Sequence, residues 1–489
     1  MSAPQLLIDA LPAWAVLNNV EFTNVGVRNI EGKGCGLVAN SDIPSPNDDA
    51  DSRQAVLIVP RDLVLSAEAV EEYAKVDQKF RQLLEIAGRN STKGDIMLYL
   101  LTHIVLSKRN QTTSRGCAST PWTEYLKFLP RHIPLPTMWS EDERELLRGT
   151  SLEPALGAKL SALVNEFDDL CEKSSELRFW QTLFWEQGTA SLEDWVLADA
   201  LYRSRCLELP QSGEAMVPAL DMANHSHNPT AYYNEDEDGN VVLLMRQGCG
   251  AQVGSEITIS YGDEKSAAEM LFSYGFIDQD HAVHDLTLPL APLPDDPLGK
   301  AKLHIFQGPP ALRLWRAGDS FNWDSPFVYL LCLNEEDGLD FRLMQDTSGG
   351  HELKVFWQEE DVTDRTCDFE QLTQDHPLRQ VFQLRVVVVL LERISTQLDR
   401  ISSTGSIEER EEQEPPPTAG QLNAECIQAA EVLRKVEINL LRGVAEMLEN
   451  ERTNLLTDAQ VVAYLGLMED SQNDQAPTQT ASNEDDDFS

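Results

Sequence analysis

Two stretches of this 489-residue sequence have the residue pattern of β-strands, and a long stretch with a helical pattern separates them. Residues 22–60 contain short apolar runs bounded by turn residues, such as NVGVRNI, GLVAN and AVLIVP. Between residues 66 and 203, apolar side chains recur three and four positions apart, a spacing typical of helices. Short apolar runs return between residues 204 and 284. Because a lone pair of strands is barely stable in water, we expect the two β-rich stretches to join in one domain.

The sequence therefore predicts an α+β protein, in which a β-rich domain is interrupted by a helical insertion and followed by a mostly α-helical C-terminal domain. The expected boundaries are 1–65 and 204–284 for the two parts of the β-rich domain, 66–203 for the insertion and 285–468 for the C-terminal domain. Residues 402–420 contain EEREEQEPPP and are expected to form an acidic linker. Residues 469–489 are expected to form a disordered acidic tail.

Two long helices are expected on either side of the acidic linker. The first covers His376–Ile401, although its four consecutive valines favour a strand. The second has one apolar stripe at helical spacing, formed by Cys426, Ala429, Leu433, Val436, Leu440 and Met447. This order predicts an antiparallel pair of core helices.

The chain is strongly acidic, with 39 basic residues against 81 acidic ones and a formal net charge of −42. Such a surface repels phosphate backbones and anionic lipids, so binding to nucleic acid or to a membrane surface is disfavoured. It favours a basic protein partner, although plain solubility explains part of the acidic excess. No apolar run approaches the ~20 residues that a membrane helix needs. We expect the chain to act as a monomer.

The eight cysteines occur singly, without a CxxC pair. In a chain of this length, that pattern predicts reduced thiols in the cytoplasm or nucleus rather than a disulfide framework. The spacing also fits no zinc cluster, and we expect no bound metal. The N-terminal sequence MSAPQLLIDALPAW has no basic start and does not resemble a signal peptide.

The segment DMANHSHNPTAYY, Asp221–Tyr233, gathers polar side chains directly after the apolar run Met216–Leu220. A surface turn is the simplest explanation of an isolated NHS. The alternative is that these side chains enter the interior to hold a ligand, which requires other segments to converge on them.

A glycine-rich segment near the N-terminus is the first candidate to meet the NHS segment. In EGKGCGLVA, Gly34 and Gly36 flank Cys35, and glycines let a backbone approach a ligand closely. A tight hairpin turn is the commoner meaning of such a pattern. The segment is not GxGxxG and opens no helix, so a dinucleotide-binding fold is disfavoured.

The second candidate is GSEITISYGDEKSAAEMLFSYGFID, which begins at Gly254. A strand over Glu256–Ser260 is expected to end at Tyr261. A helix through Lys265–Leu271 is then expected to present Tyr274. Taken alone, either tyrosine is better explained as part of a core than as a catalytic group.

Together the three segments resemble the SET-domain protein lysine methyltransferases. GKGCGLVA resembles the first motif of that family, NHS with the preceding VPALDM the second, and ISYG followed by SYGF the third. The helical interruption, with PWTEYLKFLP and MWSEDE, resembles the long insert of the Rubisco large-subunit methyltransferase class. Ser204-Arg205 also fits that class, in which the C-terminal helical region is a substrate-binding domain.

The resemblance implies S-adenosyl-L-methionine as the cofactor and a protein lysine as the methyl acceptor. Lys33, Gly34 and Cys35 would contact the methionine moiety of the cofactor through their backbone, and Asn224 and His225 would contact its amino group and adenine. In this family the NHS segment lines the cofactor pocket, which would explain why polar residues enter the interior.

The resemblance also implies a substrate site. Arg205 and Asp221 would lie where the class binds substrate, Tyr261 would be the catalytic hydroxyl that orients the lysine nitrogen, and Tyr274 would close the lysine channel. The implied substrate is a lysine-rich protein, such as a ribosomal protein, an elongation factor or a histone.

The sequence departs from relatives at two points. No cysteine-rich segment follows Phe276, and Leu209 stands where some relatives have a second arginine. Two other functions stay open: methylation of a protein histidine, which some members of the class perform on actin, and a non-catalytic SET fold that only binds a partner. Metallo-hydrolase and serine-hydrolase functions are disfavoured because HExxH and GxSxG are both absent.

Overall fold

The structure, a computed structural model, describes residues 5–46, 55–108, 117–262, 264–278, 282–345, 351–403 and 422–474. The chain divides into two compact units. The first comprises residues 1–147, 152–283 and 420–432, and the second comprises residues 148–151, 284–419 and 433–489.

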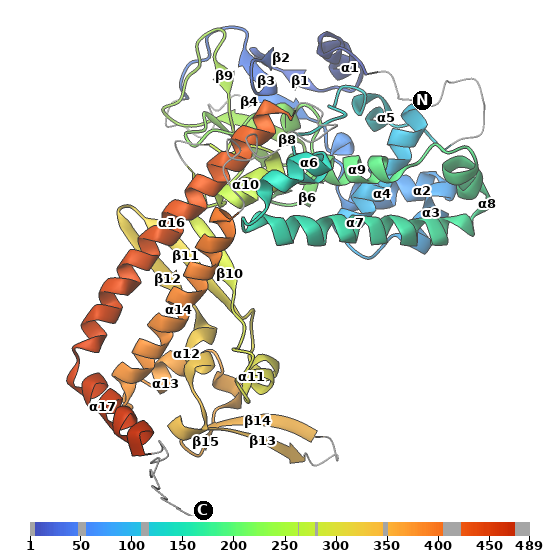
Figure 1. Ribbon diagram of the computed structural model, residues 1–489. Helices are drawn as coiled ribbons and strands as arrows, with labels where there is room; N and C mark the ends of the chain where they lie inside the picture. Colours follow the sequence, from blue (N-terminus) through green and yellow to red (C-terminus); the bar gives the residue numbers. More distant parts are fainter. Residues whose placement is uncertain are drawn as a thin grey trace, which may run out of the picture. The chain divides into compact units, whose positions relative to one another are not determined.

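The strands of the first unit form two small sheets and a hairpin (Figure 1). One sheet has the order β1-β4-β8-β7, with β1 at Glu21–Phe22, β4 at Ala55–Val59, β8 at Val241–Met245 and β7 at Ala231–Glu235. The other has the order β2-β3-β9, with β2 at Val25–Ile30, β3 at Gly34–Ala39 and β9 at Glu256–Ile257. The hairpin joins β5, Cys206–Leu209, to β6, Gly213–Met216.

Strands from both sides of the helical insertion pair with each other, as the sequence predicts. Leu57 of β4 lies opposite Leu243 of β8, and Val38 of β3 lies opposite Glu256 of β9. In each of these two pairs, the partner residues are about 190 to 220 positions apart in the sequence. This pairing brings the glycine-rich segment next to the segment that leads to Tyr261.

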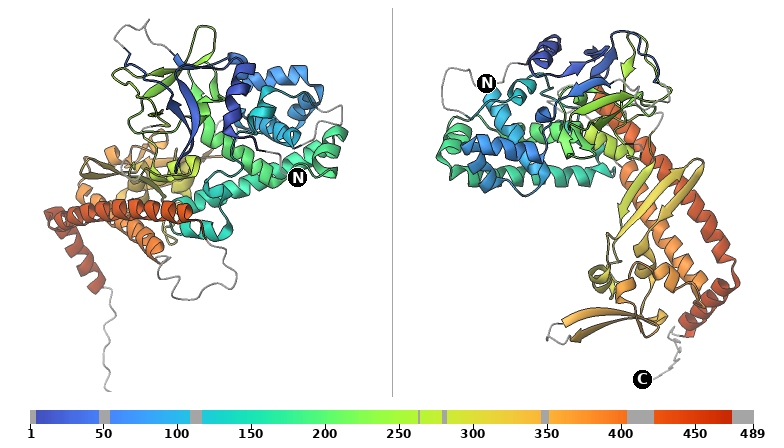
Figure 2. Two further views of the ribbon diagram at one scale, coloured as in Figure 1. Left: turned by 90° about the horizontal axis from the view of Figure 1, so that it is seen from above. Right: turned by 180° about the vertical axis from the view of Figure 1, so that it is seen from behind.

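The helices of the first unit lie beside its strands (Figures 1 and 2). They are α1 Leu11–Leu17, α2 Ala67–Val76, α3 Gln78–Ala87, α4 Thr92–Ser107, α5 Pro121–Tyr125, α6 Glu141–Arg144, α7 Leu152–Ser175, α8 Arg178–Trp180, α9 Leu192–Arg205 and α10 Ala267–Tyr274. Ser66, Asp77, Ser91 and Ser191 cap α2, α3, α4 and α9 by accepting backbone N–H groups of the first turn. Helix α4 is buried almost all round, so it forms the centre of the insertion.

The structure corrects three local predictions near the NHS segment. Strand β9 ends at Ile257 instead of Ser260, and the segment beyond it makes only an isolated bridge to His225. Helix α10 begins at Ala267 and ends at Tyr274, because Ser266 caps its first turn and Gly275 ends it in a left-handed conformation. Residues Leu220–Met222 fall in the stretch 204–284, whose short apolar runs predict strands, but they form a turn of 3-10 helix.

The second unit contains strands as well as helices. Its strands form the sheet β10-β11-β12, at Asp285–Pro289, Ala311–Ala317 and Ser320–Asp324, and the sheet β13-β14-β15, at Leu339–Gln345, His351–Trp357 and Glu360–Asp361. Its helices are α11 Gly299–Ile305, α12 Pro326–Cys332, α13 Phe369–Leu372, α14 Arg379–Ser402, the part of α16 (Ala424–Leu456) from Leu433 onward, and α17 Ala459–Asp474.

Helices α14 and α16 run antiparallel within this unit (Figure 2). Gln383 donates to Glu451 at 2.8 Å, and Arg434 donates to the carbonyl of Ile401 at 3.1 Å, so the start of one helix lies beside the end of the other. The valine run of α14 is helical because burial of Val386 and Val387 outweighs the strand preference of branched side chains. Most of the expected acidic linker lies outside the described residues, as do residues 475–489, whereas α17 extends to Asp474 into the expected tail.

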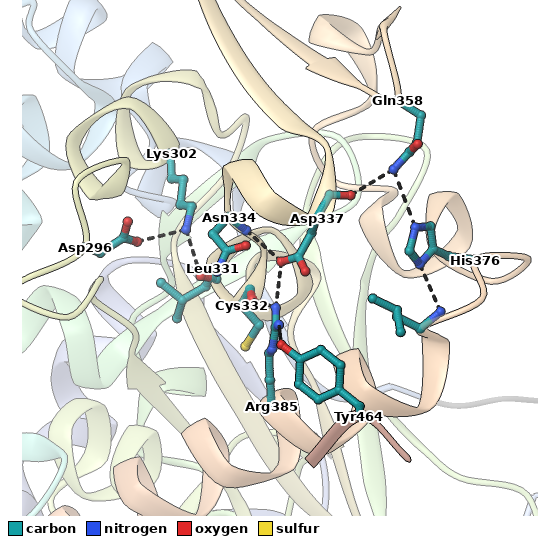
Figure 3. Close-up of polar contacts among 11 residues, drawn as sticks. Asp296, Lys302, Leu331, Cys332, Asn334, Asp337, Gln358, His376, Arg385 and Tyr464 are labelled. Carbon is teal, nitrogen blue, oxygen red and sulfur yellow. Dashed lines mark hydrogen bonds and ion pairs between the residues drawn. The ribbon is translucent and has the colours of Figure 1, made fainter. Parts of the chain in front are cut away.

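A buried polar network holds the second unit together around Asp337 (Figure 3). Arg385 of α14 donates to the Asp337 carboxylate at 2.6 Å and to the hydroxyl of Tyr464 in α17 at 3.0 Å. Nearby, Lys302 is 1% exposed and donates to Asp296 at 2.8 Å and to the carbonyl of Leu331 at 2.9 Å. Every charge in the network has an opposite charge or a hydrogen-bond partner, which is what allows it to be buried.

Candidate active site

The NHS segment is only partly interior. It follows the fully buried residues Val217–Leu220, and its first three polar side chains are half-buried, whereas His227 and Asn228 are exposed. Its backbone pairs with the segment before Tyr261: the Ile259 amide donates to the carbonyl of Asn224 at 3.0 Å, and the Ser226 amide donates to the carbonyl of Ile259 at 3.0 Å. The polar residues therefore enter the interior as part of a short parallel pairing.

Tyr261 lies against both the NHS segment and Tyr274. Its hydroxyl donates to the carbonyl of Ala223 at 2.8 Å, and its amide donates to His225 Nδ1 at 3.1 Å. Its ring stacks on that of Tyr274, with centroids 4.5 Å apart and planes inclined by 29°. The Tyr274 hydroxyl donates to the carbonyl of Tyr261 at 3.3 Å. The structure thus brings the expected catalytic and channel tyrosines together.

Arg205 and Asp221 form a partly buried pair next to these tyrosines. Arg205 Nη1 donates to the Asp221 carbonyl at 2.8 Å and lies 3.4 Å from its carboxylate, whose side chain is fully buried. Tyr125 of α5 donates to the other carboxylate oxygen and accepts a hydrogen bond from the Ala219 amide at 2.8 Å. Both oxygens of Asp221 are therefore engaged, and its geometry suits holding Arg205 in place.

The glycine-rich segment meets the NHS segment through Glu256. One oxygen of the Glu256 carboxylate accepts a hydrogen bond from the Asn224 amide at 2.8 Å, and the other forms an ion pair with Lys33 at 2.9 Å. A Cβ atom at Gly36 would lie 2.8 Å from the Asn224 amide nitrogen, so only glycine lets β3 run this close. Gly34 and Cys35 begin the same strand, and the Cys35 thiol donates to Asn29 at 3.3 Å.

A cleft of about 500 Å³ joins the substrate-side residues in the first unit. Arg205, Asp221, Tyr261 and Tyr274 all line it. Further lining residues that the sequence alone does not single out include Tyr202, Glu208, Glu214 and Tyr233. They come from the end of α9, the β5–β6 hairpin and β7, which the chain order places close to Arg205 and to the NHS segment.

Burial governs the ionisation of these groups. It raises the pKa of Tyr261 strongly, with the Arg205 charge acting in the opposite direction, and it raises the pKa of Tyr274 to about 12. Burial also raises the pKa of Asp221, against the lowering effect of Arg205 and Tyr125, and that of the Cys35 thiol. Tyr261 and Tyr274 are therefore neutral phenols at physiological pH and cannot act as bases there.

In the described residues, no group of three or more His, Cys, Asp or Glu side chains is arranged to hold a metal ion. Among the same residues, no helix combines the length and apolar character needed to cross a membrane.

Known proteins resemble this chain in sequence and in fold. No protein-family model matches it. SET domain-containing protein 8 of Schizosaccharomyces pombe is 29% identical over 370 residues, which cover 74% of this chain and 79% of that protein. The chloroplastic Rubisco large-subunit N-methyltransferase of Pisum sativum is 25% identical over 349 residues, covering 68% and 65%. The structure of Rubisco LSMT bound to AdoMet superposes with a TM-score of 0.64 at 20% identity, covering 92% of each chain.

In sequence and in fold, this chain resembles the Rubisco large-subunit methyltransferase-like class of SET-domain proteins. A relative with a different acceptor residue in its name is the actin-histidine N-methyltransferase of Danio rerio. It is 23% identical over 380 residues, covering 72% of this chain and 57% of that protein. Around the candidate site, sequence reasoning also missed Glu256 and Tyr125. Tyr125 lies within PWTEYLKFLP, one of the segments that suggested the class, but no local pattern indicated that it contacts Asp221.

Proposed function

We propose that this chain transfers a methyl group from S-adenosylmethionine to the side-chain nitrogen of a lysine in a protein substrate. The observation that carries the proposal is the stacked pair Tyr261 and Tyr274 in a cleft lined by Arg205, with the hydroxyl of Tyr261 directed at the backbone of the NHS segment.

The residues beside the cleft fit the cofactor. The Arg205 Nε atom is buried without a hydrogen-bond partner, and a guanidinium in that state suits the cofactor carboxylate. The amide nitrogen of Asn224 is used by Glu256, so its oxygen is left to accept from the cofactor amino group. When bound, S-adenosylmethionine supplies a methyl group on a sulfonium. Lys33, Gly34 and Cys35 would contact the methionine moiety by their backbone, and His225 the adenine.

Tyr261 orients the acceptor amine in this proposal. Its hydroxyl hydrogen is directed to Ala223, so the lone pairs of the oxygen accept an N–H of the substrate lysine. Burial keeps the phenol neutral, so the lysine loses its own proton to water before it attacks. Tyr274 narrows the approach so that the nitrogen is aligned with the methyl group.

The proposed substrate is a lysine-rich protein such as a ribosomal protein, an elongation factor or a histone. The net charge of −42 supports a basic partner, because opposite charge increases the rate of encounter. None of the eight cysteines forms a disulfide with another, which fits the cytoplasm or the nucleus. Histidine methylation is the second candidate, and the similarity to the actin-histidine enzyme favours it. A partner-binding SET fold without turnover is the third.

Transfer of labelled methyl from S-adenosylmethionine into a proteome from cells that lack this protein tests the proposal. Labelled proteins are digested, and the modified residue is identified by mass spectrometry. We expect label on lysine. Label on histidine would move the chain to the second candidate, and cofactor binding without any label would favour the partner-binding protein.

A further inference from the structure

Two glutamates face each other in the wall of the cleft. Glu208 of β5 and Glu214 of β6 are register partners across the hairpin, both line the cleft, and both are exposed. Like charges directly opposite in an antiparallel pair destabilise it. A neutral or basic residue at one of the two positions would make the hairpin more stable. Folding therefore does not explain why both positions are glutamate.

Among the described residues, no arginine or lysine forms an ion pair with Glu208 or Glu214, and Lys265, which also lines the cleft, lies over the ring of Tyr274. The two cleft arginines have other carboxylate partners, since Arg205 pairs with Asp221 and Arg203 pairs with Asp199 at 2.7 Å. The glutamates therefore present two negative charges to whatever enters the cleft.

Tyr202 provides a second, independent sign of a ligand at the same place. It lines the cleft and is 6% exposed, yet its buried hydroxyl makes no hydrogen bond of acceptable geometry. Burial raises the pKa of this hydroxyl most, and Cys206 and Glu214, which lie close enough to interact with it, raise the pKa further, so the hydroxyl stays neutral. A buried hydroxyl without a well-aligned partner destabilises the folded protein, and a bound polar group would supply such a partner.

The occupant of this subsite cannot be the lysine that is methylated. Two carboxylates would stabilise its ammonium form and raise its pKa, whereas the reaction needs the neutral amine. The site suits a second cation, and a guanidinium has enough N–H donors to donate hydrogen bonds to both carboxylates.

We propose that Glu208, Glu214 and Tyr202 form a specificity subsite that binds an arginine or lysine close in sequence to the target lysine. This inference rests on the proposed function, because it presumes that the substrate peptide enters the cleft at Tyr261. It deepens that function by specifying the substrate class: target lysines with a basic neighbour.

Peptide binding tests the subsite without requiring turnover. The probe is a short fluorescent peptide with one central lysine flanked by arginines, compared with the same peptide carrying glutamine in place of arginine. Both are titrated by anisotropy with full-length protein saturated with S-adenosylhomocysteine. We expect wild type to prefer the arginine peptide, and the Glu208→Gln/Glu214→Gln variant to bind it about tenfold more weakly.

A matched control removes two charges elsewhere. Glu237→Gln/Asp238→Asn changes the net charge by the same amount in the exposed turn between β7 and β8, which does not line the cleft. We expect this control to retain the preference. Tyr202→Phe should reduce the preference for the arginine peptide by about threefold, because it removes the hydroxyl that contacts the bound cation. Thermal melts of all variants establish that each is folded.

If the cleft variant and the control lose the same affinity for the arginine peptide, the effect is one of long-range charge and the subsite is overturned. Equal binding of the two peptides by wild type would also overturn it. The outcome is separable from the proposed function. A preference that depends on Glu208 and Glu214, in a protein that methylates no lysine, supports the subsite and refutes lysine transfer. Lysine transfer without the preference does the reverse.

Discussion

Tyr261 is held as a neutral phenol by its burial, and this has a consequence for how the rate depends on pH. Since no tyrosine in the cleft takes up the proton, the fraction of neutral lysine in solution limits attack. A free lysine has a pKa near 10.4, so this fraction rises about tenfold per pH unit between about pH 6 and 9. We expect kcat/KM to rise with the same slope in a methyl-transfer assay. A plateau near neutral pH would instead indicate an enzyme group that accepts the proton.

Glu256 positions Asn224, because it accepts from the Asn224 amide and pairs with Lys33. Replacing it with methionine should leave the amide free to rotate and weaken cofactor binding by about tenfold. Glu256→Gln keeps an acceptor oxygen and should weaken binding less. Calorimetric titration with S-adenosylmethionine measures both.

A double-mutant cycle separates this role from general destabilisation. If Glu256 acts through Asn224, Glu256→Met should weaken binding little further in an Asn224→Ala background. Additive losses would mean that the two residues act independently.

The sequence singles out site residues by the motifs that contain them, and their roles stay predictions. The structure brings Asn224 and Lys33 together on Glu256 and stacks Tyr261 on Tyr274. Their supporting partners were not predictable. Tyr125 reaches Asp221 across 96 positions and Glu256 reaches Lys33 across 223. A single carboxylate or phenol in a strand or helix looks the same whether it faces solvent or a distant motif, so only the fold identifies it.

The end of helix α10 depends on Gly275, which caps the helix at φ +84° directly after Tyr274. A Cβ atom there would lie 2.8 Å from the carbonyl oxygen of Pro134. Gly275→Ala should therefore lower stability by more than the ~1 kcal/mol typical of the backbone strain and should impair transfer by displacing Tyr274.

Gly254→Ala is the matched control, since Gly254 has φ +85° but open space around its Cβ position. Thermal melts and initial rates compare the two variants. Similar losses in both would show that the contact with Pro134 does not matter.

Glu437 interrupts the apolar stripe of α16 with a buried carboxyl. It is 3% exposed, and Ser151 donates to it from its amide at 3.0 Å and from its hydroxyl at 2.5 Å. Burial raises its pKa from 4.5 to about 7. The folded state therefore holds a proton that the unfolded state has released between about pH 4.5 and 7, so the stability contribution of Glu437 falls as pH rises through this window.

Glu437→Gln should abolish that loss. Its melting temperature relative to wild type should rise from pH 5 to pH 8, reflecting at most about 3 kcal/mol. A difference that stays constant with pH would contradict the raised pKa.

At the level of elements, hydrophobic periodicity predicted the long helices, whereas contacts between distant segments decided the shorter elements. The helical insertion and the stripe of α16 follow from spacing, and the valine run of α14 is helical because Val386 and Val387 are buried in the core of the second unit. The short β9 and the 3-10 turn at Leu220–Met222 were mispredicted, because the pairing of Asn224 with Ile259 replaces a regular ladder there. Such pairing depends on segments that a local pattern does not contain.

At the scale of the molecule, the order of β-rich, helical and β-rich segments was sufficient to predict that distant strands reunite. The pairs β3–β9 and β4–β8 do so and bring the motifs within contact. The excess of acidic residues is spread over the sequence and says only that a basic partner is favoured. The chemistry depends on the small region where those strands meet.

The most direct test of methyl transfer through Tyr261 compares wild type with Tyr261→Phe in two assays on the same preparations. Calorimetry measures binding of S-adenosylmethionine, and radiolabel transfer measures turnover on the protein substrate identified by mass spectrometry. We predict that cofactor affinity is retained while transfer falls by about 100-fold or more, because the acceptor amine is no longer oriented. Full transfer activity in Tyr261→Phe would contradict the assignment of Tyr261.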